Sequence, residues 1–250
     1  MSVEGKRVLV TGASSGIGEG LVRRLAADGA RVGLLARRAD RLRELASELT
    51  SAAGPAEAAS ADVTDPDAVL AAVDDLAARL GGLDAVVAAA GTMHLGAVAD
   101  TDPARWHEIL DVNVAGLLHT ARAALPHLGA GATLVVVSSM SGRRVPGAAG
   151  GVYAASKHAA HGVAETLRLE AGPRGVRVTT LAPGFVATDL MAADLTDAEG
   201  ADREDVTAFR ERMHAEGLTP ADVAAAVVHV LGLPPEVCVV EYALVSTRQQ

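Results

Sequence analysis

Short apolar segments alternate with longer amphipathic segments along the whole chain, and this alternation constrains the fold more than any other feature. Several of the short segments are continuous runs of Val, Leu and Ala, which is typical of strands that helices cover on both faces. The pattern therefore predicts an α/β fold, a doubly wound parallel sheet of about seven strands with helices on both faces. We expect strands at Arg7–Val10, Arg31–Leu35, Ala56–Ala61, Ala85–Ala89, Thr133–Ser138, Val176–Leu181 and Val237–Val245. We expect helices at Gly18–Asp28, Arg38–Ala53, Pro66–Leu80, Pro103–His127, Tyr153–Ala171 and Pro220–Leu231.

The chain length of 250 residues is near the upper end of what one hydrophobic core supports. No repeat, low-complexity linker or Pro/Ser-rich boundary divides the sequence, so residues 1–250 are expected to form a single domain. Residues 185–218 stand apart, because they carry many charges and form a long connection between a strand and a helix. We interpret this segment as a substrate lid.

Charge and apolar content argue against two classes of partner. The formal net charge is −9 and no basic run exceeds two residues, which argues against binding to the phosphates of nucleic acid. The apolar stretches are shorter than the roughly 18 residues of a membrane span, and the N-terminus does not resemble a signal peptide. The single cysteine, Cys238, cannot form an internal disulfide. These features predict a cytoplasmic protein.

A glycine-rich turn, Thr11–Gly18, follows the first expected strand and opens the first expected helix. Gly12 permits a tight turn, Gly16 lets the backbone approach a pyrophosphate, and Gly18 lets the helix pack closely on the strand. The phosphates would then meet the positive end of the helix dipole. The spacing is GxxxGxG, and a purely structural turn is the alternative. We interpret the turn as a Rossmann-like dinucleotide site.

The residues after the second expected strand distinguish between the two nicotinamide dinucleotides. An acidic residue there would bind the ribose 2′-hydroxyl of NAD, whereas this sequence has Arg37 and Arg38. Two guanidinium groups offer permanently charged donors for a 2′-phosphate. We therefore predict NADP(H) as the cofactor. The alternative is that the two arginines simply begin a solvated helix face.

Tyr153 and Lys157 are four residues apart, which places them on one face of an expected helix. The chain has two tyrosines and two lysines, so a Tyr-x-x-x-Lys pair would arise by chance roughly 0.016 times. We expect the ammonium group to lower the pKa of Tyr153 from its usual value of about 10 toward the range of a general acid or base. An ordinary pair on a helix surface is the alternative.

Two hydroxyl side chains, Ser138 and Ser139, follow the buried segment Val135-Val136-Val137. Ligands of open α/β sheets bind outside the carboxyl ends of the strands, so a hydroxyl here can hydrogen-bond a substrate oxygen. Either serine could instead cap the turn into Met140.

Four further side chains near these motifs have two interpretations each. Arg143 and Arg144 could bind a substrate carboxylate, although exposed loop arginines are common. His158 and His161 lie at a helical spacing, but no further ligand cluster accompanies them in the sequence. We therefore expect these histidines to face solvent or a subunit contact, and we expect no metal site.

With these motifs in place, the sequence resembles the short-chain dehydrogenase/reductase family along nearly its whole length. The resemblance implies that Tyr153 is the catalytic acid or base, and that Lys157 binds the ribose hydroxyls and lowers the pKa of Tyr153. It also implies that Ser139 hydrogen-bonds the carbonyl oxygen and that Asn113 organises a proton-relay water. The cofactor contacts that it implies, together with those predicted above, are Gly12, Ser14, Ser15, Gly16, Ile17, Gly18, Arg37, Arg38, Asp62, Val63, Ala89, Gly91, Tyr153, Lys157, Pro183, Gly184, Val186 and Thr188.

One departure from the family concerns the turn after the fourth expected strand. The family has Asn-Asn-Ala-Gly there, whereas this chain has Ala88-Ala89-Ala90-Gly91. The side-chain hydrogen bonds that usually brace the central sheet are therefore missing, and we expect the turn to be less stable.

The resemblance implies an NADP(H)-dependent oxidoreductase, a carbonyl reductase or alcohol dehydrogenase acting on a small or medium ketone, aldehyde or hydroxy substrate. One alternative is a protein that binds NADP(H) as a signal and catalyses nothing. The other is an isomerase or dehydratase that uses the same cofactor turn, although such enzymes usually have a longer substrate domain. The family resemblance also implies a homotetramer in which the helices Pro103–His127 and Tyr153–Ala171 pack against their symmetry mates.

Overall fold

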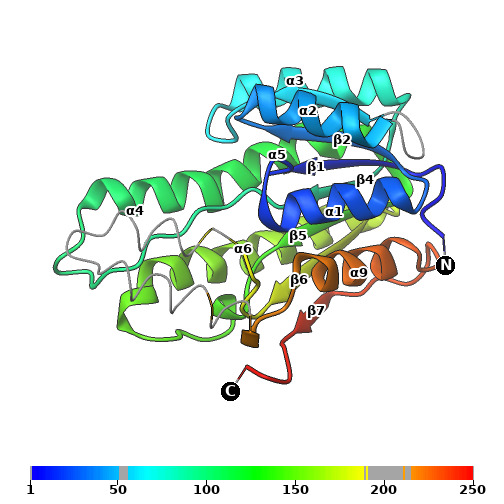
Figure 1. The fold of residues 1–250 in the computed structure, drawn as a ribbon. Helices are drawn as coiled ribbons and strands as arrows, with labels where there is room; N and C mark the ends of the chain where they lie inside the picture. Colours follow the sequence, from blue (N-terminus) through cyan, green and yellow to red (C-terminus); the bar gives the residue numbers. More distant parts are fainter. Residues whose placement is uncertain (1, 51–55, 189, 191–210, 212–214, 250) are drawn as a thin grey trace.

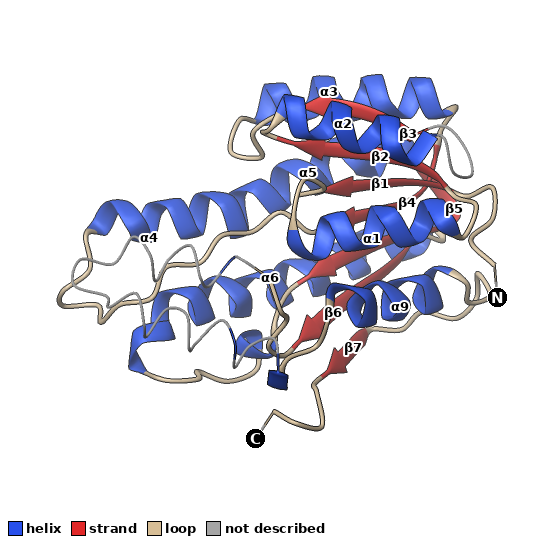
Figure 2. Cartoon of the chain, in the orientation of Figure 1, coloured by secondary structure: helices blue, strands red, loops and turns tan. Residues whose placement is uncertain are grey.

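Seven strands form a single parallel sheet in the order β3-β2-β1-β4-β5-β6-β7 (Figures 1 and 2). The structure is a computed structural model that describes residues 2–50, 56–188, 190, 211 and 215–249. The strands are β1 (Arg7–Thr11), β2 (Arg31–Ala36), β3 (Ala56–Ser60), β4 (Leu83–Ala88), β5 (Leu128–Val137), β6 (Arg177–Pro183) and β7 (Glu241–Leu244). The predicted doubly wound α/β sheet is thereby confirmed.

Helices pack on both faces of the sheet, as Figure 1 shows. One face is covered by α1 (Gly16–Ala27), α2 (Ala39–Thr50) and α9 (Pro220–Leu231), and the other by α3 (Pro66–Leu80), α5 (Gly116–Ala124) and α6 (Gly151–Ala171). Successive strand residues supply the two cores in turn: Val8 and Val10 pack under the first layer, and Leu9 packs under the second. Because both faces are buried, the strands are continuously apolar.

Local signals in the sequence set the helix ends. Asp65 caps α3 by accepting hydrogen bonds from the backbone N–H groups of Asp67 and Ala68, and a left-handed Gly81 ends that helix. Thr219 and Asp222 form a reciprocal capping box at the start of α9. These helices therefore begin where the sequence predicts.

Three predicted elements differ clearly from the structure. The strand predicted at Thr133–Ser138 begins earlier, at Leu128. The predicted helix Pro103–His127 is divided into α4 (Pro103–Leu110), a π-helical turn (Asp111–Ala115), α5 and a 3₁₀ turn (Leu125–His127). The predicted strand Val237–Val245 was too long, because only Glu241–Leu244 forms a ladder with β6. The carbonyl oxygens of Leu233, Pro234 and Val237 instead accept hydrogen bonds from the buried Arg177 guanidinium, which holds this segment in a loop.

The strand order reverses between β1 and β4, the point where open α/β sheets bind ligands at their carboxyl ends. Four predicted site segments lie at or just after the carboxyl ends of strands: the glycine turn, Ala88–Gly91, Ser139 and Pro183. The predicted lid, residues 185–218, lies mostly outside the described residues. No helix of the described part is long and apolar enough to cross a membrane.

Candidate active site

The glycine turn between β1 and α1 has backbone geometry that side chains would disturb. Gly12 and Gly16 adopt left-handed conformations, with φ of 70° and 54°. A Cβ on Gly12 would lie 2.8 Å from Ala90 Cα, and a Cβ on Gly18 would overlap the carbonyl group of Gly12. The first turn of α1 therefore opens directly at the carboxyl end of the sheet, which suits a pyrophosphate at the helix N-terminus.

The segment Pro183–Thr188 lies across from this turn. A Cβ on Gly16 would be 3.3 Å from Thr188 Cγ2. The segment is held by the C-terminal tail, since Gly184 N–H donates to the Leu244 carbonyl (2.8 Å) and Phe185 N–H donates to Gln249 Oε1 (3.0 Å). The structure thus brings two predicted cofactor segments together.

The end of β2 carries the two predicted phosphate-binding arginines. The Arg38 guanidinium donates to Ser14 Oγ (3.0 Å) and to the Ser14 carbonyl (3.0 Å). Arg37 is 68% exposed and lies 3.7 Å from Asp62. Burial raises the pKa of Asp62, but hydrogen bonds from Thr64 and the nearby Arg37 outweigh it, so the net pKa lies below its usual value. Arg38 therefore contacts the glycine turn directly, whereas Arg37 is exposed and lies beside Asp62.

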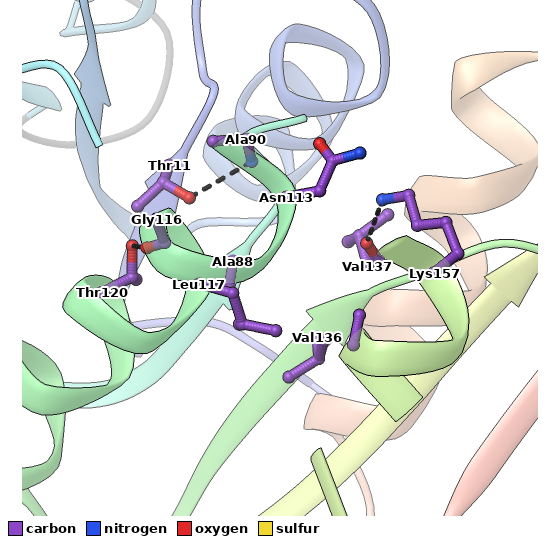
Figure 3. A pocket seen from close by; sticks show the side chains of 11 residues that line it. Thr11, Ala88, Ala90, Asn113, Gly116, Leu117, Thr120, Val136, Val137 and Lys157 are labelled. Atoms are coloured by element: carbon purple, nitrogen blue, oxygen red, sulfur yellow. Dashed lines mark hydrogen bonds between the residues drawn. The ribbon is translucent and has the colours of Figure 1, made fainter. Parts of the chain in front are cut away.

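Thr11 holds the turn Ala88–Gly91, where the family has asparagines and this chain has alanines. Its Oγ accepts hydrogen bonds from the backbone N–H groups of Ala89 (3.2 Å) and Ala90 (3.3 Å). Figure 3 shows the bond to Ala90 at the edge of a small internal cavity. The asparagine hydrogen bonds of the family are absent, as expected, but Thr11 supplies a side-chain brace that was not predicted. A hydroxyl at the end of β1 is the signal that could have predicted it.

The two serines after β5 point to different places. Ser139 hydrogen-bonds the side chain of Tyr153, and its Oγ also accepts from the Ser141 N–H (3.0 Å). Ser138 turns the other way and donates to the Lys157 carbonyl (3.2 Å). Ser139 thus both caps the following turn and faces Tyr153, so the two interpretations of this residue are compatible.

Burial governs the titration of the Tyr153 and Lys157 side chains. Burial raises the pKa of Tyr153, and the hydrogen bond from Ser139 only partly opposes it. Burial also lowers the pKa of Lys157 to about 8. Lys157 Nζ lies 5.7 Å from the Tyr153 ring centroid and donates to the Val137 carbonyl (3.3 Å). The expected lowering of the Tyr153 pKa by Lys157 was therefore wrong in its net direction.

Asn113 lies in the π-helical turn between α4 and α5, and its amide is fully engaged. Its Oδ1 accepts from Thr92 N–H (2.8 Å), and its Nδ2 donates to the Thr92 carbonyl (2.9 Å) and to Ser156 Oγ (3.0 Å). Asn113 and Lys157 border the small cavity of Figure 3, which has room for about one water molecule. Turns of this kind are common at functional sites.

Three of the remaining side chains have partners in the structure. Arg143 Nε lies 3.3 Å from Glu241 Oε1, so this guanidinium is engaged. His158 is exposed and bonds the Ala154 carbonyl of its own helix. His161 turns inward toward Ser138, so the expectation that it faces solvent was wrong. The described residues contain no group of three or more His, Cys, Asp and Glu side chains that could hold a metal ion.

Comparison with known proteins identifies the family. The family model for short chain dehydrogenase matches residues 6–199. The chain belongs to the short-chain dehydrogenase family. It is therefore an oxidoreductase of a family whose members bind a nicotinamide cofactor and a small-molecule substrate.

The relatives of this short-chain dehydrogenase include full-length matches and one partial match. An uncharacterised oxidoreductase of Staphylococcus epidermidis is 36% identical over 97% of this chain and 97% of its own length. Glycine betaine reductase of Emericella nidulans is 38% identical over 99% of this chain, which spans 19% of that longer protein.

Solved structures of the family match the whole fold. A short chain dehydrogenase from Burkholderia cenocepacia in complex with NADP has a TM-score of 0.84 and 36% identity, with 98% of each chain covered. An alcohol dehydrogenase from Thermococcus sibiricus, complexed with 5-hydroxy-NADP, has a TM-score of 0.84 and 31% identity, with 99% of each chain covered.

Proposed function

We propose that this protein is an NADP(H)-dependent carbonyl reductase or alcohol dehydrogenase for a small or medium ketone, aldehyde or hydroxy substrate. The observation that carries the proposal is the cluster of Ser139, Tyr153 and Lys157 beside the glycine turn, at the carboxyl end of the sheet. A hydroxyl, a phenol and an amine at this edge are the groups that proton transfer to a carbonyl oxygen requires.

In this proposal the nicotinamide, when bound, supplies or accepts the hydride. Tyr153 holds the proton that the developing alkoxide takes up, and its raised pKa keeps that proton in place at neutral pH. Ser139 donates a hydrogen bond to the carbonyl oxygen, where negative charge develops. Lys157 binds the ribose hydroxyls and, as a cation, favours the Tyr153 phenolate once the proton has left.

Asn113 contributes to this mechanism through its main chain. Because its side-chain amide is already bonded to Thr92 and Ser156, we assign the backbone carbonyl of the π-helical turn to a relay water. The cavity beside Lys157 provides the space for that water. A proton could then pass from solvent through this water to Lys157 and Tyr153.

Arg37 and Arg38 favour NADP(H) over NAD(H). Arg38 contacts the glycine turn and the exposed Arg37 precedes it in the chain, so both would offer donors to the 2′-phosphate of NADP, and neither position is a carboxylate that would bind a 2′-hydroxyl. Asp62 and Val63 would contact the adenine, and Ala89, Gly91, Pro183, Gly184, Val186 and Thr188 the nicotinamide half. The NADP complex of the Burkholderia relative supports this choice.

We also propose a homotetrameric assembly in the cytoplasm. Leu110, Leu118 and Leu169 are exposed on α4, α5 and α6, the helices expected to pack against symmetry mates. Sedimentation of Leu118→Glu tests this assembly, because a charge in the interface should yield smaller particles. The single cysteine is in keeping with a reducing compartment.

The test of function is consumption of NADPH and of NADH with a panel of ketones, aldehydes and keto acids. The wild type should prefer NADPH, Tyr153→Phe should lose turnover while still binding NADPH, and Arg37→Asp/Arg38→Ala should lose the preference for NADPH. Tight NADPH binding without turnover on the panel would instead favour the nucleotide-sensing alternative. Equal use of both cofactors would refute the role of the two arginines.

A further inference from the structure

We propose that His161 is a positioning residue, which fixes the turn that carries Ser139 against the helix that carries Tyr153 and Lys157. This inference rests on the proposed function. His161 lies four residues beyond Lys157, one helical turn further along α6. Its imidazole is directed away from the glycine turn, toward the end of β5 and the edge strand β7.

The Nδ1 edge of the imidazole joins α6 to the end of β5. Nδ1 lies 2.9 Å from the Lys157 carbonyl oxygen and 3.0 Å from Ser138 Oγ. A carbonyl oxygen only accepts hydrogen bonds, so Nδ1 carries a proton in this arrangement. Ser138 itself donates to the same Lys157 carbonyl at 3.2 Å. The residue before Ser139 is thereby tied to the helix at the level of Lys157.

The ring also forms the surface on which the 3₁₀ turn Met140–Gly142 rests. A Cβ on Gly142 would overlap the imidazole, so glycine is the residue that lets the turn pack directly against His161. The N–H of Ser141, within this turn, donates to Ser139 Oγ. A displacement of the turn would therefore move the hydroxyl that bonds Tyr153.

The Nε2 edge of the imidazole fixes the other end of the same turn. Nε2 lies 3.4 Å from Glu241 Oε1, and the same carboxylate oxygen lies 3.3 Å from Arg143 Nε. Arg143 directly follows Gly142 in the chain. The turn from Ser139 to Gly142 is thus held at its start through Ser138 and at its end through Arg143. His161 contacts the Lys157 carbonyl, which Ser138 bonds, and the Glu241 carboxylate, which Arg143 contacts.

A histidine matches these contacts better than an apolar residue would. The ring has two nitrogens on opposite edges, and both donate when the ring is the imidazolium; here one faces a carbonyl oxygen and the other a carboxylate. Asparagine can place an amide nitrogen near the Nδ1 position, and glutamine can place one near the Nε2 position. These two replacements therefore separate the two edges experimentally.

The first test compares the kinetics of His161→Leu, His161→Asn and His161→Gln with the wild type. We expect His161→Leu to lower kcat about tenfold or more, because misplaced catalytic groups are costly. The dissociation constant of NADPH should not change, since the ring faces away from the cofactor turn. His161→Asn should recover much of the loss and His161→Gln less. The control is His158→Leu on the exposed side of the same helix, which should leave kcat unchanged.

A second test does not depend on turnover and therefore separates this inference from the proposed function. The chain has two tyrosines, so in a Tyr242→Phe background the phenolate absorbance reports Tyr153 alone. The Ser139 hydrogen bond lowers the pKa of Tyr153. Loss of that bond in His161→Leu should shift the titration to higher pH, and His161→Asn should restore it.

Each outcome decides between positioning and a merely structural role. An unchanged kcat and an unchanged Tyr153 titration in His161→Leu would overturn the inference, as would equal losses in kcat, NADPH affinity and unfolding temperature. If His161→Leu does not fold, Glu241→Gln keeps the side-chain shape and weakens the contacts of this carboxylate with His161 and Arg143. It should then lower kcat by a smaller factor in the same direction, and no effect on kcat or on the Tyr153 titration would refute the proposal. A wild type without reductase activity refutes the proposed function, while the tyrosine titration still tests His161.

Discussion

Replacing Lys157 with methionine should stabilise the fold at neutral pH, although Lys157 belongs to the proposed catalytic group. The ammonium group lies in the interior, where burial lowers its pKa from 10.5 to about 8. A base whose pKa is lower in the folded than in the unfolded protein destabilises the fold whenever it must be charged in both states. Methionine has a similar length and no charge, so Lys157→Met removes this cost.

The size of the effect follows from the two pKa values of Lys157. Above pH 10.5 the amine is neutral in both states and costs nothing. As the pH falls from 10.5 to about 8 the unfolded chain binds the proton first, and the wild type loses stability at about 1.4 kcal/mol per pH unit. Below about pH 8 the accumulated cost stays at about 3 kcal/mol.

Urea unfolding of wild type and Lys157→Met at several pH values measures this difference. The advantage of the variant should shrink by about 2 kcal/mol between about pH 7 and about pH 9.5. Lys6→Met, at the only other lysine, is the matched control and should show no such trend. A stability difference that is independent of pH would refute the argument, because packing changes do not titrate.

Three further substitutions test the packing and the surface charges by denaturant unfolding. Thr219→Ala removes the capping box of α9 and should lower the free energy of unfolding by about 1 kcal/mol. Arg177→Leu leaves the carbonyl oxygens of Leu233, Pro234 and Val237 without this donor and should lower it by about 3 kcal/mol. Hydrogen bonds from the Arg7 side chain lower the pKa of Asp84, so this carboxylate stabilises the fold above about pH 4 and the gain is lost as the pH falls. Asp84→Asn should lower the free energy of unfolding by at most about 1 kcal/mol at neutral pH, because the Arg7–Asp84 pair is about one-third exposed. The variant should also lose less stability than the wild type as the pH falls.

The parallel sheet could be predicted from the sequence because its signals are local. The inner strands β2 and β4 are runs of mostly apolar residues buried on both faces, and α3 and α9 carry their own caps at Asp65 and Thr219. The start of β7 and the π-helical turn at Asn113 have no such signal. Arg177 donates to the Val237 carbonyl before β7, and the Thr92 N–H donates to Asn113 Oδ1 in the π-helical turn. The chain makes both hydrogen bonds only after distant segments have come together.

The same limit applies to the candidate site. The spacing of Tyr153 and Lys157 on one helix follows from helical periodicity, so the sequence predicts that they share a face. Which of two adjacent serines faces Tyr153 depends on how the end of β5 meets α6. That contact involves His161, whose position one helical turn after Lys157 was visible in the sequence but whose direction was not.

The titration of Tyr153 shows why charge spacing alone predicts pKa values poorly. A neighbouring ammonium favours the phenolate, but the folded chain also removes the phenol from water, and that desolvation determines the net direction. The same burial brings the pKa of Lys157 to about 8. Below that pH both groups hold their protons, which is the state that can protonate an alkoxide. In the proposed function, the buried cluster would therefore hold the protons that reduction consumes, and the reverse reaction would require their removal at higher pH.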